Sequence, residues 1–487
     1  MSKKDILLGL FIVIALVVFG NQNFFLKTLP EKIMGTDTYK KDTLTIVLNT
    51  PVHDLSPYNL NLDDLIRTGN IYEGLVAFDR TLKLVPALAV TWGNIDPTTW
   101  QFKLRKEVTF HDGTAFDAQS VLKSFEDARS NGNGQIKTLL QTVKEITVLD
   151  PYTIQIHTTA PDPLILSKLT KFFISRPNTV GTGAYQFVEW EKGIAIKLTA
   201  FPNYWGQRPT YKHASYVVTQ NKVQRESDFR EGRTDILVAV PKEQAINLPK
   251  DQVKSSYSLE VNFMMFKLDD PLLKDRAMRE AIQAMIDPAK IEDIGNNFVR
   301  RVSQFVAPGV FGFNPALPPF EFDEAKVPKS LFGEQKMKIS MDYLPTYKTL
   351  VEYLERQFED AGFQFKGNPI EADALLGRIR KNESQLYILG WQSENGDAGD
   401  FLDSFIHSAG EFNNGRYKNA TVDRLIEKSR TELNPDRRLE LLQKINELVS
   451  DDLIGIPLFE SSRLYAVKKG LVWEPRLDGL VLAKDVR

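Results

Sequence analysis

The sequence predicts an α/β fold with a parallel sheet, most clearly in residues 336–402. Short strand-like runs alternate there with two longer segments whose apolar residues recur at helical spacing. An alternation of this kind needs crossover helices, which favours parallel strands. The strand-like runs are 336–343, 363–365 and 386–389, and the helical segments are 350–361 and 371–380.

The stretch 390–402, GWQSENGDAGDFL, directly follows the last of these strand-like runs. Ligands of open α/β sheets bind outside the carboxyl ends of the strands, so this expected loop is a candidate binding site. Trp391 is suited to form a pocket wall. Glu394 and Asp397 are suited to bind a cation or an amine, although paired acids also cleave glycosides in some enzymes. A solvated acidic turn explains the same residues equally well.

The composition bounds the function further. A chain of 487 residues is long enough for two or three domains. Its 61 basic and 63 acidic residues give a net charge of -2, which does not support nucleic-acid binding. There is no cysteine, and the five histidines form no close pair, so we predict no metal or other cofactor.

The N-terminus carries an apolar run at residues 6–19, preceded by Lys3 and Lys4. Its length is typical of the apolar h-region of a signal peptide and short for a membrane span. Two alternatives stay open, namely cleavage after Gly20 or an uncleaved membrane anchor over residues 6–26. Both send most of the chain across a membrane, so a periplasmic or extracytoplasmic protein is predicted, with membrane contact only through this segment.

One short pattern in the sequence is typical of a class of enzymes. Ser120 and Lys123 match the S-x-x-K element of penicillin-recognising hydrolases, whose S-D-N and K-T-G elements do not occur in the sequence. Asp117 predicts a helix N-cap just before them, with an apolar face over 121–128. A membrane-anchored exported serine hydrolase is therefore the alternative function, and a helix surface is the simpler explanation.

Several motifs follow one another in order from about residue 44 to the C-terminus. They include IYEGLV (71–76), VTFHDGT (108–114), VGTGAY (180–185), the pair Gly390–Trp391 and IPL (456–458). Together they resemble the dipeptide- and oligopeptide-binding proteins of ABC importers, solute-binding family 5. The resemblance implies a non-enzymatic, monomeric protein that binds a short peptide and delivers it to a membrane permease. A receptor or scaffold without transport is a further alternative.

The same resemblance implies a periplasmic-binding-protein-like fold of type II, cluster C-like, in which two α/β lobes close on a ligand beside an extra domain. The expected boundaries follow from it. Lobe I comprises 44–71, 181–267 and 456–487, the extra domain 72–180, and lobe II 268–455, after a signal peptide or anchor with its tether at 1–43.

The resemblance further implies the ligand site. Relatives hold the ligand's α-amino group with an acid in the pattern G-W-x-x-D-x-x-D-P. Here Glu394 and Asp397 occupy the two acid positions, and Ala398 replaces the proline, which predicts a looser loop. The longer Glu394 puts the usual amine geometry in doubt.

The other residues of the expected site lie beside this loop. Gly390, Trp391 and Gln392 would line it, with main-chain groups near Gly390 binding the peptide backbone. Lys267 stands where relatives often have an asparagine that contacts the ligand, and it would change the charge of the pocket.

Overall fold

The computed structural model describes residues 42–323, 325, 327, 336–393, 395–413 and 415–487. The predicted signal peptide or anchor at 6–26 lies outside these residues. Among the residues described, no helix combines the length and the apolar character needed to cross a membrane.

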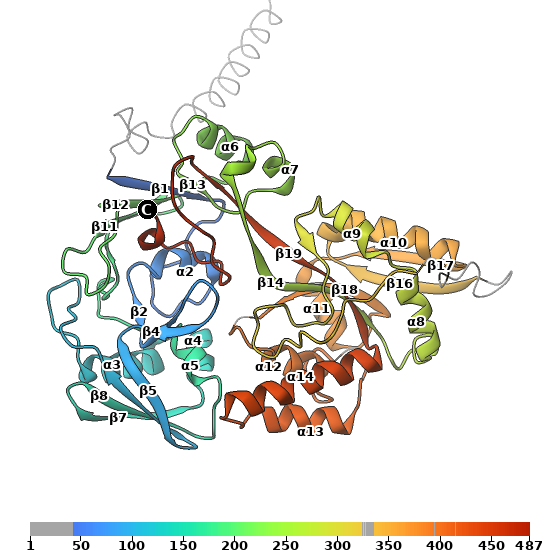
Figure 1. Cartoon of the computed structure of the whole chain (residues 1–487), viewed down its shortest axis with the longest axis horizontal. Helices are drawn as coiled ribbons and strands as arrows, with labels where there is room; N and C mark the ends of the chain where they lie inside the picture. Colours follow the sequence, from blue (N-terminus) through green and yellow to red (C-terminus); the bar gives the residue numbers. More distant parts are fainter. Residues whose placement is uncertain (1–41, 324, 326, 328–335, 394, 414) are drawn as a thin grey trace, which may run out of the picture.

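An eleven-stranded mixed sheet runs through the molecule (Figure 1). Its strand order is β10-β11-β12-β1-β13-β19-β14-β18-β16-β17, and β15 (Val299–Arg300) pairs with β19. The long strands β14 (Val253–Phe266) and β19 (Gly455–Val467) lie at the centre and are antiparallel. They connect the two ends of the sheet.

The residues predicted as lobe I form one end of this sheet. Strand β1 is parallel to both β12 and β13, whereas β10, β11 and β12 are antiparallel neighbours. Leu44, Ile46, Tyr185 and Tyr216 are buried in the core beneath them. The elements are β1 (Thr43–Leu48), α2 (Leu62–Thr68), β10 (Tyr185–Glu191), β11 (Ala195–Ala200), β12 (His213–Val218), α6 (Lys222–Arg230), β13 (Ile236–Leu237), α7 (Lys242–Ala245) and η1 (Lys250–Gln252).

Residues 72–180 form a separate four-stranded antiparallel sheet, in the order β5-β6-β8-β7, with helix α3 against it. Asp117 caps α3 as predicted, because its carboxylate accepts the Ser120 N–H. Two small two-stranded sheets, β2-β9 and β3-β4, flank the larger one. The elements are β2 (Glu73–Gly74), β3 (Val76–Phe78), β4 (Leu84–Pro86), β5 (Ala89–Asp96), β6 (Thr99–Leu104), α3 (Ala118–Asn131), α4 (Gly134–Leu139), β7 (Val143–Asp150), β8 (Thr153–Thr158), α5 (Ile165–Leu169) and β9 (Phe173–Ile174).

The residues predicted as lobe II contain the expected β-α-β-α-β unit. Strand β16 is parallel to both β17 and β18, which confirms the predicted parallel arrangement. Helices α10 and α11 lie between these strands in the chain. The elements are α8 (Arg276–Ala284), α9 (Pro288–Ile294), β16 (Met337–Tyr343), η3 (Pro345–Tyr347), α10 (Lys348–Asp360), β17 (Phe363–Pro369), α11 (Ala372–Arg380), β18 (Leu386–Gln392), α12 (Gly399–Phe401), η4 (Leu402–Ile406), α13 (Ala420–Ser429) and α14 (Pro435–Asp452), and η5 (Ala483–Asp485) closes the chain.

Strand β18 is longer than its apolar run predicts. Gly390, Trp391 and Gln392 belong to the strand and pair with β14, whereas the sequence placed them in the loop after it. The expectation that this loop starts at Gly390 is therefore wrong. The polar and small residues there end the apolar pattern, but the partner strand continues the hydrogen-bonded ladder.

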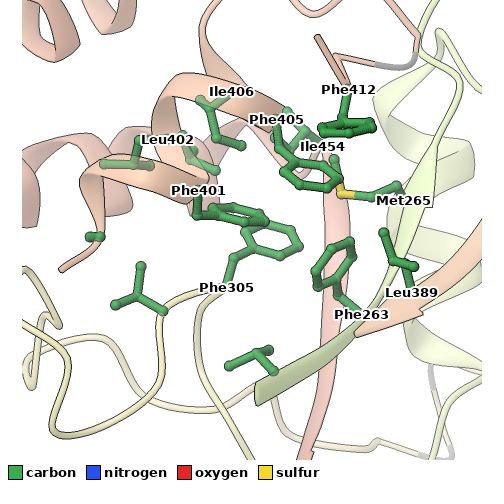
Figure 2. Packing of buried hydrophobic residues seen from close by; sticks show 14 of the residues in the cluster. Phe263, Met265, Phe305, Leu389, Phe401, Leu402, Phe405, Ile406, Phe412 and Ile454 are labelled. Carbon is green, nitrogen blue, oxygen red and sulfur yellow. The ribbon is translucent and has the colours of Figure 1, made fainter. Parts of the chain in front are cut away.

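A cluster of phenylalanines packs beneath this end of β18. Figure 2 shows Phe263 of β14 facing Phe305, Phe401 and Phe405. The rings of Phe401 and Phe405 stack with centroids 5.0 Å apart, and Phe263 meets Phe305 edge-on at 5.4 Å. Full burial of a phenylalanine contributes about 1.5–3 kcal/mol, so this cluster fixes the segment after β18 against the central strand.

The pairing of the two central strands is interrupted between their ends. The register of β14 against β19 shifts between Tyr257 and Val261 and again between Asn262 and Phe263. Within the first gap Leu259 has a φ of 60°, a left-handed conformation that is uncommon for a bulky residue. This irregular point lies where the strands pass from one end of the sheet to the other.

Candidate ligand-binding cleft

A cleft of about 1580 Å³ opens between the two ends of the central sheet. Its walls come from residues far apart in the sequence: 72–87 and 134–173 on one side, 390–404 on the other, and 476–484 at the C-terminal end. Leu259 and Glu260 of β14 also line it, at the interrupted part of the strand. The cleft therefore adjoins the point at which the two central strands lose their pairing.

Three residues of the predicted site come together on one wall. Gly390, Trp391 and Gln392 all line the cleft, opposite Asn262, Val261 and Glu260 of β14 in the strand register. Strand β16 pairs with β18 only from Leu386 to Ile388, so among the residues that the structure describes no partner strand covers that edge of β18 beyond Ile388.

Trp391 rests on the aromatic cluster beneath the cleft. Its ring meets Phe405 edge-on, with centroids 5.0 Å apart, and lies 6.5 Å from Phe401. Its indole N–H is buried and has no hydrogen-bond partner among the described residues. The ring is thus half-buried in the core and half-presented to the cleft, the arrangement expected for a pocket wall.

Hydrogen bonds hold the described residues of the segment after β18. The Ser393 hydroxyl accepts from the Asp397 N–H at 2.9 Å and donates to its carbonyl at 2.8 Å. The Ala398 N–H donates to the Phe311 carbonyl at 2.9 Å, a bond that a proline at this position would lack. This bond stabilises the loop at the position where loosening is predicted.

Asp397 forms a buried ion pair with Arg438 of α14. One guanidinium nitrogen lies 2.8 Å from Oδ1, and a second binds Oδ2. Oδ1 also accepts from the Gly399 N–H at 2.8 Å. The two side chains are only 7 % and 5 % exposed, so the geometry favours a role for this carboxylate in holding the loop, rather than in contacting a ligand.

Of the two remaining predicted residues, Glu394 and Lys267, the structure describes only Lys267. Glu394 lies outside the described residues. Lys267, at the end of β14, donates through Nζ to the Asn382 carbonyl at 2.8 Å and is not among the described residues that line the cleft. Its ammonium therefore stabilises the loop after α11.

Glu260 is a cleft residue that the sequence patterns did not single out. It lines the cleft, and its carboxylate lies beside Gly390. Burial raises the pKa of the Glu260 carboxyl above its usual value, and the positive charge of Arg463 opposes that rise. The signal available in the sequence was one acidic residue at the start of the apolar run 259–266.

The residues of the hydrolase alternative lie elsewhere. The Ser120 hydroxyl donates to the Asp117 carboxylate at 2.9 Å and accepts from the Asp117 N–H, which completes a capping box. Neither Ser120 nor Lys123 is among the described residues that line the cleft. The S-x-x-K pattern is thus explained by the start of α3.

An interrupted two-strand connection beside a deep cleft defines a two-lobed binding protein. The chain belongs to the bacterial extracellular solute-binding proteins, family 5, whose model matches residues 83–413. This membership confirms the predicted family, the extracytoplasmic location and binding rather than catalysis.

Curated relatives and solved structures cover nearly the whole chain. The dipeptide-binding protein of Escherichia coli (strain K12) is 22 % identical over 465 residues, covering 83 % of this chain and 87 % of that protein. The glutathione-binding protein GsiB of Salmonella paratyphi A is also 22 % identical, covering 86 % and 88 %. The unliganded open form of the periplasmic murein tripeptide-binding protein MppA superposes with a TM-score of 0.81 at 17 % identity, covering 92 % and 97 %. This confirms the predicted fold class.

Proposed function

We propose that this protein binds short peptides in the cleft and delivers them to an ABC permease in the membrane. The observation that carries the proposal is the edge of β18 beyond Ile388, which lies at the cleft wall and has no partner strand in the described part of the chain. A peptide laid along such an edge gains main-chain hydrogen bonds that tolerate many side chains. The relatives named for dipeptides and glutathione support the same ligand class.

The cleft is larger than a typical small-molecule site, which leaves room for a peptide of several residues. Sites for small molecules typically enclose about 300–1,000 Å³, and this cleft is larger at about 1580 Å³. Trp391 offers a flat apolar surface beside the open edge, and Gly390 and Gln392 flank it. In our proposal these three residues contact the peptide, and Glu394 pairs with its amino group. Asp397 and Lys267 act through the surrounding structure instead.

The proposed movement is closure of the lobes about β14 and β19. In this proposal lobe I (44–71, 181–267 and 456–487) and lobe II (268–455) turn about the interrupted pairing near Leu259. Hinges of this kind are a few residues that absorb a change in backbone angles. The protein acts as a monomer, and residues 6–26 tether it to the membrane if they are not cleaved.

Isothermal titration calorimetry with a panel of di- to pentapeptides tests the proposal. We expect at least one peptide length to bind one-to-one, and Trp391→Ala to weaken that binding. Val188→Ala, a change at an exposed residue that does not line the cleft, is the matched control and should bind like the wild type. Absence of binding by every peptide length would contradict the proposed ligand class.

A further inference from the structure

Glu260 occupies an unusual place in the cleft. It lies on β14 opposite Gln392, next to the left-handed Leu259, and lines both the main cleft and a second cavity of about 370 Å³. A methyl group added to Gly390 would come within 2.4 Å of Glu260 Oε1. The missing side chain at Gly390 thus makes room for this carboxylate at the wall where the peptide is proposed to lie.

The other described acids of the cleft already have partners. Glu73 accepts from Thr182, Tyr204 and Trp205, and Asp403 pairs with Arg430 at 2.9 Å. Glu260 differs from them, because among the described residues its carboxylate accepts no hydrogen bond and forms no ion pair. The further partnered acids are Asp79, with the Thr81 and Lys83 amides, Asp162, with Lys168, Asp400, with the Phe401 amide, and Asp478, with Arg476.

The side chain of Asn262, two positions further along β14, does have hydrogen-bond partners. The Asn262 side chain accepts from the Tyr347 hydroxyl at 2.5 Å and donates to the Ser461 hydroxyl at 3.1 Å. Glu260 points from the same face of β14, since the two residues are two positions apart. A buried carboxylate without such partners is poorly stabilised, and burial raises the pKa of Glu260 against the opposing charge of Arg463.

We infer that Glu260 is a specificity-determining residue whose carboxylate accepts an ammonium group of the bound ligand. A charged N–H donor would supply the hydrogen bond and the close ion pair that Glu260 lacks among the described residues, where the charge of Arg463 acts on it without direct contact. The inference rests on the proposed function, because it places the ligand along the Gly390 wall. The ammonium comes either from a lysine side chain or from the peptide's amino terminus, which Glu260 would then hold in place of Glu394, and the experiment separates these sources.

Calorimetric titrations of the full-length wild type and of Glu260→Gln test this assignment. The probes are Ala-Ala-Ala, N-acetyl-Ala-Ala-Ala and N-acetyl-Ala-Lys-Ala. Alanine residues are added or removed where the wild type prefers another peptide length. Glutamine keeps the size of the side chain and removes its charge. Asp403→Asn is the matched control, because it removes the charge of another cleft acid that already has a partner.

We expect the wild type to bind at least one ammonium-bearing probe about 10- to 100-fold more tightly than N-acetyl-Ala-Ala-Ala. Glu260→Gln should lose that preference while still binding the acetylated peptide, and Asp403→Asn should keep it. If Glu260→Gln loses the preference for Ala-Ala-Ala, the ammonium that Glu260 accepts is the amino terminus. If it loses the preference for N-acetyl-Ala-Lys-Ala, that ammonium is the lysine side chain.

Two results would overturn the inference, and they are distinguishable. If the wild type binds peptides and Glu260→Gln keeps the full preference for ammonium, Glu260 is not its acceptor, although the proposed function stands. If the wild type binds none of the peptides, the proposed function fails together with the inference. The melting temperature of Glu260→Gln serves as the folding control, and it should equal or exceed that of the wild type.

Discussion

Asp397→Asn separates a structural role of this residue from a role in ligand binding. The substitution keeps the size of the side chain and leaves the Arg438 guanidinium without its counter-charge in a site where both side chains are less than 10 % exposed. Removing one partner of a buried ion pair destabilises a protein by about 3–5 kcal/mol. We therefore expect a loss of about 3 kcal/mol, the lower end of that range, because Arg438 keeps its bond to the Ser429 carbonyl.

Chemical denaturation followed by tryptophan fluorescence measures this loss. Arg438→Met should be similarly destabilised, since it leaves Asp397 unpaired, and the double variant should lose clearly less than the sum of the two single losses. Peptide affinity of the folded Asp397→Asn protein should stay within a few-fold of the wild type. An unchanged denaturation midpoint together with a large loss of peptide affinity would refute the structural assignment.

Three further results are expected. Glu260→Gln should stabilise the ligand-free protein at neutral pH. Burial raises the pKa of Glu260 in the folded state, so the wild type loses stability as the pH rises from the pKa of the unfolded state through the higher pKa of the folded state. Stability curves against pH that run parallel for both proteins would contradict this. Gly390→Ala should weaken peptide binding less in a Glu260→Ala background than in the wild type, because the added methyl group then meets no carboxylate. Equal effects in both backgrounds would contradict the packing of Glu260 against Gly390. Ser120→Ala should lower stability by about 1 kcal/mol through the lost capping box and leave peptide binding unchanged. Labelling of the wild type by a fluorescent β-lactam that Ser120→Ala abolishes would contradict this structural role of Ser120.

The parallel unit of lobe II was predictable from local pattern. Residues 336–389 alternate between short apolar runs and amphipathic segments, and β16, α10, β17, α11 and β18 fall on them. The cap of α3 was equally local: Asp117 precedes the helix and accepts the Ser120 N–H as expected. In each case residues within a few positions of one another decide the structure.

The details of the site depended on residues distant in sequence. The partner of Asp397 is Arg438, 41 positions away, and nothing near either residue marks the pair. Glu260 and Gly390 meet only because β14 and β18 are neighbours in the sheet. The end of β18 was misplaced for the same reason, since pairing with β14 overrides the turn-forming character of Gly390. Local patterns therefore predicted the wall of the cleft but not its charges.

Small-angle X-ray scattering of the full-length protein, with and without a peptide that binds in calorimetry, tests the central claim most directly. Enclosure of the peptide between lobes that turn about β14 and β19 predicts a smaller radius of gyration in the complex. The same peptide should produce no compaction in a variant that no longer binds it. A radius of gyration that stays unchanged at saturating peptide would contradict closure of the two lobes on the ligand.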